Sequence, residues 1–137
     1  MHDKVETYYK HTIAWYEQPT LLRYTPGGLY KGHADSDNYD EQLDCWHKTL
    51  DRSVSLLIYL NDEYTGGAIK FNKFNYRYQP KRGDLLFFPS DFRYMHEAEK
   101  VESGVRYALV SWSALSNTPR VMSGRPKNSI VLDESGV

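Results

Sequence analysis

Short hydrophobic runs, rich in β-branched and aromatic residues, follow one another along most of the chain, and turn residues separate them. The intervening segments are too short to hold helices, so the pattern favours antiparallel pairing and no run reads as part of a βαβ unit. We expect strands at 21–25, 29–34, 53–60, 68–71, 76–79, 84–88, 93–101 and 105–115. Together these runs predict an antiparallel sandwich or small barrel.

The start of the chain follows a different period. Hydrophobic residues recur there at steps of three and four positions, beginning at Val5, which predicts one amphipathic packing helix over residues 3–17. The fold class expected from the whole pattern is therefore an all-β core with a short N-terminal helix.

Two segments lack a clear period. Residues 36–48 are rich in acidic side chains and are expected to form either a solvated loop or a lid over a site. Residues 116–137 are predicted to be a loose C-terminal tail, in which Ile130, Val131 and Leu132 could add one more strand.

Length and charge limit the remaining classes. The 137 residues predict a single domain over 1–137, with its core at about 20–115. A net charge of -1 gives no basic excess for nucleic acid, and no apolar run is long enough to span a membrane. The first residues lack the layout of a signal peptide, so we expect a cytoplasmic protein. Because Cys45 is the only cysteine, a metal site would need histidine and carboxylate ligands.

His33 lies in the predicted strand 29–34, and Asp35 follows its last residue. In extended chain, residues i and i+2 point to the same face. The two residues can therefore present an imidazole and a carboxylate side by side. A histidine from another strand, for which His96 is the candidate, would complete the two-histidine, one-carboxylate set that holds Fe(II). A hydrogen-bonded structural histidine is the alternative explanation of the short His-x-Asp pattern taken alone.

Arg106 lies in line with apolar residues on one face of the last long run. If residues 102–104 turn the chain, His96 and Arg106 lie on paired antiparallel strands, displaced by about 16 Å. That separation would fit a ligand that chelates a metal at one end and presents a carboxylate to the arginine fork at the other. An arginine that points to solvent is the alternative.

Tyr59 shares a strand face with Ser55 and Leu57. Its hydroxyl could lie in a cavity beside Arg106, or it could be bonded to backbone within the core.

Taken together, these residues resemble the prolyl 4-hydroxylase-like branch of the Fe(II)- and 2-oxoglutarate-dependent dioxygenases. The resemblance covers residues 24–112 and includes the ten-residue step from His96 to Arg106. Its other motifs, in order, are Tyr24-x2-Gly27-x2-Tyr30-x2-His33-x-Asp35, Ile58-Tyr59-Leu60-Asn61-Asp62, Gly66-Gly67, Gly83-Asp84-Leu85-Leu86-Phe87-Phe88 and Ser103-Gly104-Val105-Arg106-Tyr107.

The resemblance implies a double-stranded β-helix, also called a jelly roll. It also implies a reaction that splits O2, decarboxylates 2-oxoglutarate to succinate and CO2 and hydroxylates a C–H bond, with ascorbate as an optional reductant. The residues to which it gives catalytic roles are His33, Asp35, His96 and Arg106. The first three of these would bind Fe(II), and Arg106 would pair with the C5 carboxylate of 2-oxoglutarate. Tyr59 would assist by hydrogen bonding, and Tyr24 would line the same pocket.

The leading hypothesis is an enzyme that hydroxylates a prolyl or similar residue in a peptide or protein. The alternatives are the same chemistry on a free amino acid or small metabolite, and a non-catalytic jelly-roll binding module. The full set of candidate residues argues against the module, and His96-Glu97 lacks the second histidine of a zinc hydrolase motif. Because few residues precede His33, we expect either a minimal enzyme or a trimmed piece of one.

Overall fold

The computed structural model of the chain describes residues 1–132. One helix, α1 (His2–Tyr9), precedes a long series of strands, and no helix in this part of the chain is long and apolar enough to cross a membrane. The strands are β1 (Ile13–Glu17), β2 (Thr20–Tyr24), β3 (Tyr30–His33), β4 (Asp37–Asp40), β5 (Cys45–Lys48), β6 (Val54–Tyr59), β7 (Tyr64–Gly66), β8 (Ile69–Phe71), β9 (Tyr76–Tyr78), β10 (Leu85–Pro89), β11 (His96–Ala98), β12 (Val101–Gly104), β13 (Arg106–Leu115) and β14 (Ser129–Ile130). Two short 3-10 helices are η1 (Asn72–Phe74) and η2 (Phe92–Tyr94).

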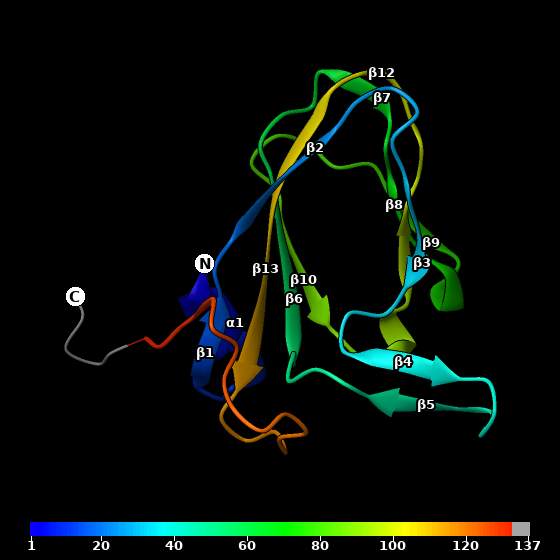
Figure 1. Ribbon diagram of the computed structural model, residues 1–137. Coiled ribbons are helices and arrows are strands. Elements are labelled where there is room, and N and C mark those ends of the chain that lie inside the picture. The colour runs from blue at the N-terminus through cyan, green and yellow to red at the C-terminus, as the bar shows by residue number, and fades with distance from the viewer. Residues whose placement is uncertain (133–137) are drawn as a thin grey trace.

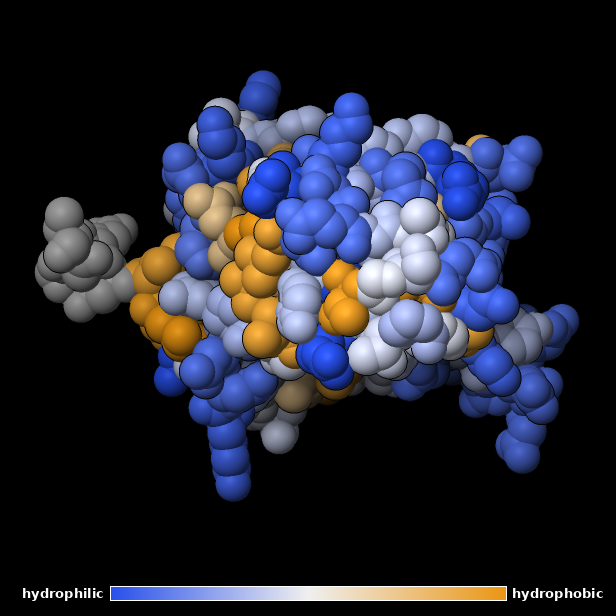
Figure 2. Space-filling view, turned by 90° about the horizontal axis from the view of Figure 1, so that it is seen from above, coloured by the Kyte–Doolittle hydropathy of each residue, from blue (hydrophilic) through white to orange (hydrophobic). Residues whose placement is uncertain are grey.

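Two antiparallel sheets face each other (Figure 1). The larger has six strands in the order β10-β6-β13-β1-β14, with β2 also paired to β13, and the smaller has the order β3-β11-β8-β9. The pair β7–β12 lies at one end of the molecule, and the hairpin β4–β5 lies at the other. Seen from the β7–β12 end, the surface is mainly hydrophilic with a band of apolar side chains (Figure 2). This arrangement confirms the predicted all-β jelly roll.

Helix α1 covers part of the outer face of the larger sheet. Its Val5 is fully buried and packs in one cluster with Ile13, Val54, Leu56 and Leu115. These residues come from α1, β1, β6 and β13. The helix is therefore part of the core.

The predicted single helix over residues 3–17 is wrong in its second half. Lys10 adopts a left-handed conformation, with φ at 57°, and ends α1. Residues Ile13–Glu17 then form β1, which pairs with β13. A spacing of three and four positions suggests a helix from the sequence alone. Here the edge of β13 supplies hydrogen-bond partners for the backbone of residues 13–17, and the segment forms a strand instead.

The predicted strand over 93–101 and the turn at 102–104 are also corrected. The segment divides into η2, β11 and β12, and β12 pairs with β7. Consequently, His96 and Arg106 do not lie on paired strands, because β11 belongs to the smaller sheet and β13 to the larger one. The two residues face the interior from opposite sheets.

The segment 36–48, expected to be either a solvated loop or a lid over a site, contains the hairpin β4–β5, so it is not a loop along its whole length. In the tail, Ile130 belongs to β14, which pairs with β1, whereas Val131 and Leu132 lie outside the strand. The last residues of the predicted tail, 133–137, lie outside the described residues.

We expect Val5→Ala to lower the free energy of unfolding by about 2 kcal/mol, because it leaves a cavity between α1 and the larger sheet. Lys4→Ala, at an exposed position of the same helix, should change it by less than about 0.5 kcal/mol. Urea unfolding measures both values. Equal values for the two variants would show that α1 does not cover the core.

Candidate active site

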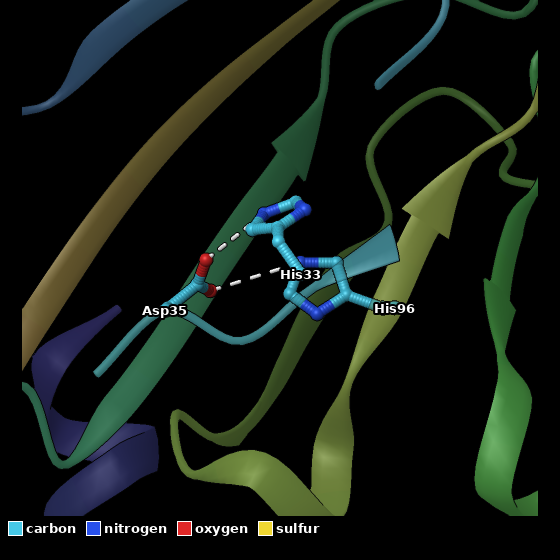
Figure 3. Close-up of side chains that lie close together, drawn as sticks. All are labelled: His33, Asp35 and His96. Atoms are coloured by element: carbon cyan, nitrogen blue, oxygen red, sulfur yellow. Dashed lines mark ion pairs between the residues drawn. The ribbon is translucent and has the colours of Figure 1, made fainter. Parts of the chain in front are cut away.

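The pairing of β3 with β11 brings two histidines together. His33 and His96 are direct partners across these strands, and their ring centroids lie 4.4 Å apart. Asp35 lies in a bend just after β3, where its backbone N–H donates to the carbonyl of Ser90 at 3.1 Å. Figure 3 shows the carboxylate of Asp35 facing both imidazole rings.

The three side chains form one compact donor cluster. The Nε2 atom of His33 lies 3.1 Å from one carboxylate oxygen of Asp35, and Nε2 of His96 lies 3.7 Å from the other. One ligand atom from each residue lies within 4.8 Å of the others. The side chains of Asp35 and His96 are only 7% and 8% exposed.

Backbone carbonyl groups fix the orientation of both imidazoles. Nδ1 of His33 donates to the carbonyl of Lys31, and Nδ1 of His96 donates to that of Tyr94, each at 2.9 Å. A carbonyl can only accept, so the proton sits on Nδ1 and the Nε2 atoms are turned toward Asp35. Histidines that bind metals usually donate their second ring nitrogen in this way.

The protonation of the cluster is strongly perturbed. Burial alone would raise the pKa of Asp35, but hydrogen bonds from His33 and Ser55 and the charge of His96 lower it to about 2. Burial lowers the pKa of His96 below its ordinary value. Burial is also the largest single effect on His33 and opposes its protonation, but the hydrogen bonds to Asp35 and to the carbonyl of Lys31, together with the charge of Asp35, outweigh it and raise the pKa of His33.

This donor set fits a divalent metal ion. Once both Nε2 atoms are deprotonated, as metal binding requires, two imidazole lone pairs and one carboxylate converge on the same small volume with a formal charge of -1. Such a set is open on one side and suits Fe(II) among the biological metals.

Further polar groups hold the loop that carries Asp35. Ser55 donates to Oδ2 of Asp35 at 2.6 Å, and Arg52 donates to its backbone carbonyl at 3.2 Å. Arg52 also forms a bidentate pair with Glu17, at 2.6 and 2.9 Å, and stacks 3.8 Å from the ring of Trp112. The position of Asp35 therefore depends on residues from three distant parts of the chain.

Arg106 is a second centre of charge, and it lies in the larger sheet. Its side chain is buried, Nη1 donates to the carbonyl of Gly67 at 2.8 Å, and the guanidinium lies 4.2 Å from the ring of Tyr24. Its Nε is buried without a hydrogen-bond partner.

Tyr59 is 2% exposed and lies on the neighbouring strand opposite Ala108. Burial raises the pKa of Tyr59, so its hydroxyl is a neutral donor at neutral pH.

Both centres open into one cavity of about 400 Å3. The sequence-predicted site residues that line it are Tyr24, His33, Asp35, Tyr59, His96 and Arg106. The alternative of a solvent-facing Arg106 is therefore wrong. His33 lies beside Asp35 and His96, as a metal site would require.

Sequence reasoning missed the roles of Arg52 and Glu17. Their ion pair joins positions 35 residues apart, and no local pattern signals it. Ser55 was recognisable in part, because strand alternation places it on the same face as Tyr59. Its hydrogen bond to Asp35 required the tertiary structure.

Comparison with known families gives one match, to the 2OG-Fe(II) oxygenase superfamily, over residues 19–114. A PKHD-type hydroxylase from Rippkaea orientalis is 32% identical over 92 residues, which cover 66% of this chain and 39% of that protein. An Acanthamoeba polyphaga mimivirus protein, provisionally named a prolyl 4-hydroxylase, is 34% identical over 76 residues, 53% of this chain and 31% of the relative. The chain thus spans less than two fifths of the length of either relative.

Solved structures show the same fold. The viral collagen prolyl hydroxylase from Paramecium Bursaria Chlorella virus-1, in its 2OG complex, matches with a TM-score of 0.67 and 25% identity, over 82% of this chain and 68% of that one. A Trichoplax adhaerens prolyl hydroxylase, in complex with a hypoxia inducible factor peptide fragment, matches with a TM-score of 0.60 and 26% identity, over 76% and 46% of the two chains.

We expect Arg52→Met to lower the free energy of unfolding by about 3 kcal/mol, because it leaves Glu17 buried without its partner. The double variant Arg52→Met/Glu17→Gln should recover part of this loss. Arg77→Met, which breaks the more exposed pair with Glu99, should cost less than about 1 kcal/mol. Denaturant unfolding measures all three; additive losses in the double variant would contradict direct coupling of Arg52 and Glu17.

Proposed function

The chain belongs to the 2OG-Fe(II) oxygenase superfamily, and from this premise we propose that it hydroxylates a prolyl residue in a peptide or protein. The superfamily uses Fe(II), 2-oxoglutarate and O2. One observation carries the proposal. The donor cluster of His33, Asp35 and His96 lines the same cavity as the buried guanidinium of Arg106, whose Nε has no hydrogen-bond partner.

His33, Asp35 and His96 would hold the iron, which supplies O2 activation and oxidation of the substrate C–H bond when it is bound. The chain's own contribution is orientation. The carbonyl groups of Lys31 and Tyr94 keep both Nε2 atoms available, and Ser55 holds the carboxylate of Asp35. These contacts reduce the reorganisation that metal binding requires.

Arg106 would bind the C5 carboxylate of 2-oxoglutarate from the opposite sheet. A guanidinium can donate two parallel hydrogen bonds to one carboxylate, and burial makes such a bond stronger. The ring of Tyr24 covers the cation, and the neutral hydroxyl of Tyr59 can donate to the same ligand. Arg106 therefore sets both the position and the orientation of the co-substrate.

Apolar side chains line much of the rest of the cavity, beside polar ones such as Asn38 and Thr49, and limit the water that it can hold. Among them are Leu22, Leu57, Ile69, Phe88 and Val110. A dry cavity protects a reactive oxidant from side reactions.

The names of the relatives support the substrate class. A collagen prolyl hydroxylase and a prolyl hydroxylase bound to a peptide fragment share this fold. No comparison favours a free amino acid, a small metabolite or a non-catalytic module. We further infer that residues 1–137 act as one domain, and a cytoplasmic location stays a prediction from the sequence.

We expect the protein to release succinate and add one oxygen atom to proline-containing peptides when Fe(II), 2-oxoglutarate and O2 are present. His96→Ala should abolish both products, because it removes one of three metal ligands. His47→Ala, at an exposed histidine of β5, should leave both unchanged. Mass spectrometry of a proline-containing peptide library measures the oxygen gain.

A second measurement separates metal binding from turnover. Under anaerobic conditions the wild-type protein with Fe(II) and 2-oxoglutarate should show a weak visible charge-transfer band that His96→Ala lacks. The same band in both proteins would remove His96 from the metal site. A band without oxygen transfer to any peptide would contradict the prolyl substrate.

We expect Arg106→Met to weaken 2-oxoglutarate binding at least about 30-fold, because the buried carboxylate loses its charged partner. The affinity for the metal ion alone should change by less than twofold, because Arg106 lies in the opposite sheet. Anaerobic calorimetric titration measures both constants.

Arg23→Met is the matched control, because Arg23 is exposed on the strand that pairs with the start of β13. It should bind both ligands as the wild type does. Equal losses of metal and 2-oxoglutarate affinity in Arg106→Met would contradict the separation of roles.

A further inference from the structure

Tyr64 is a buried tyrosine that the proposed mechanism does not use. It begins β7, where it pairs with Gly104 of β12, and its side chain is 9% exposed. Its hydroxyl is buried and has no hydrogen-bond partner. Tyr64 does not line the cavity, so a direct contact with a ligand is not its role.

Gly67 shows that Tyr64 lies next to Arg106. A Cβ atom added to Gly67 would lie 3.2 Å from Cε2 of Tyr64 and 3.5 Å from Cδ of Arg106. The two side chains therefore border the same space, which the missing side chain of this glycine leaves open. Cδ is bonded to Nε in arginine, and Cε2 is adjacent to the ring carbon that carries the hydroxyl in tyrosine.

The two groups without partners are chemically complementary. Nε–H of Arg106 can only donate, and the phenol oxygen of Tyr64 can accept. Each is buried, and a buried polar group without a partner is unfavourable. Burial raises the pKa of Tyr64, although the charge of Arg106 opposes this effect, so the phenol stays neutral at neutral pH.

Arg106 is already fixed on two other sides. Its Nη1 donates to Gly67, and one face of the guanidinium lies against Tyr24. Rotation about the end of the side chain is the freedom that remains. A bond from Nε to Tyr64 would remove it and leave the Nη edge for a ligand.

We propose that Tyr64 is a positioning residue for Arg106, and that its phenol oxygen accepts the Nε–H bond when a dicarboxylate occupies the cavity. This role rests on the proposed function, since it assigns the contact to 2-oxoglutarate binding. Tyr64 acts through Arg106 and sets the affinity for the co-substrate without touching it.

The test is Tyr64→Phe, which keeps the ring and removes the hydroxyl. The Kd of 2-oxoglutarate, measured by anaerobic calorimetry on the Fe(II)-loaded protein, should rise about tenfold, the value of one hydrogen bond. The KM for 2-oxoglutarate should rise in parallel, while kcat at saturation and the Kd of the metal change less than twofold. Tyr76→Phe removes a hydroxyl from a side chain that is 53% exposed and should change none of these values.

A double-mutant cycle with Arg106→Lys tests whether Tyr64 affects 2-oxoglutarate binding through Nε of Arg106. Lysine has no counterpart of Nε–H, so Tyr64→Phe should not weaken binding further in that background. An equal loss in both backgrounds, or an unchanged Kd in Tyr64→Phe, overturns the proposal. A wild-type protein that binds no 2-oxoglutarate would instead overturn the proposed function.

Discussion

The convergence of Asp35 on two imidazole nitrogens is the constraint on which the rest of the structure depends. Three lone-pair groups within 4.8 Å of one another repel unless protons or a cation lie between them. The pairing of β3 with β11 sets the two histidines opposite each other, and Ser90 and Ser55 hold the bend that carries Asp35. The fold therefore holds three groups together that would otherwise move apart.

The opposite sheet carries the complementary charge. Arg106 is buried with a free Nε and no carboxylate partner among the ion pairs of residues 1–132, which is costly for an isolated cation. A ligand with two acidic ends relieves this cost at Arg106 and can also meet a metal at the donor cluster. The two sheets of the jelly roll allow one ligand to reach both sites. The smaller sheet presents the donor cluster to the shared cavity, and the larger sheet presents Arg106.

The sequence was sufficient for most of the strands and for a set of residues that line one cavity, because both follow from local periods and motif spacing. It did not determine which strands pair. His96 and Arg106 are close in sequence, yet β12, which lies between them and pairs with β7, carries the chain from one sheet to the other. Ile13–Glu17 became a strand for the same reason, since the edge of β13 lies about a hundred residues away. Pairing between distant segments also explains why Arg52 and Glu17 were missed.

Arg52 shows how such distant contacts make the site rigid. It pairs with Glu17 of β1 and stacks on Trp112 of β13, both in the larger sheet. It also donates to the carbonyl of Asp35, which follows β3 of the smaller sheet. The side chain of Arg52 therefore links the two sheets at the donor cluster. No internal disulfide can do this, because the chain has a single cysteine. Because the planar guanidinium uses several donors in fixed directions, it holds the bend that carries Asp35 against the larger sheet.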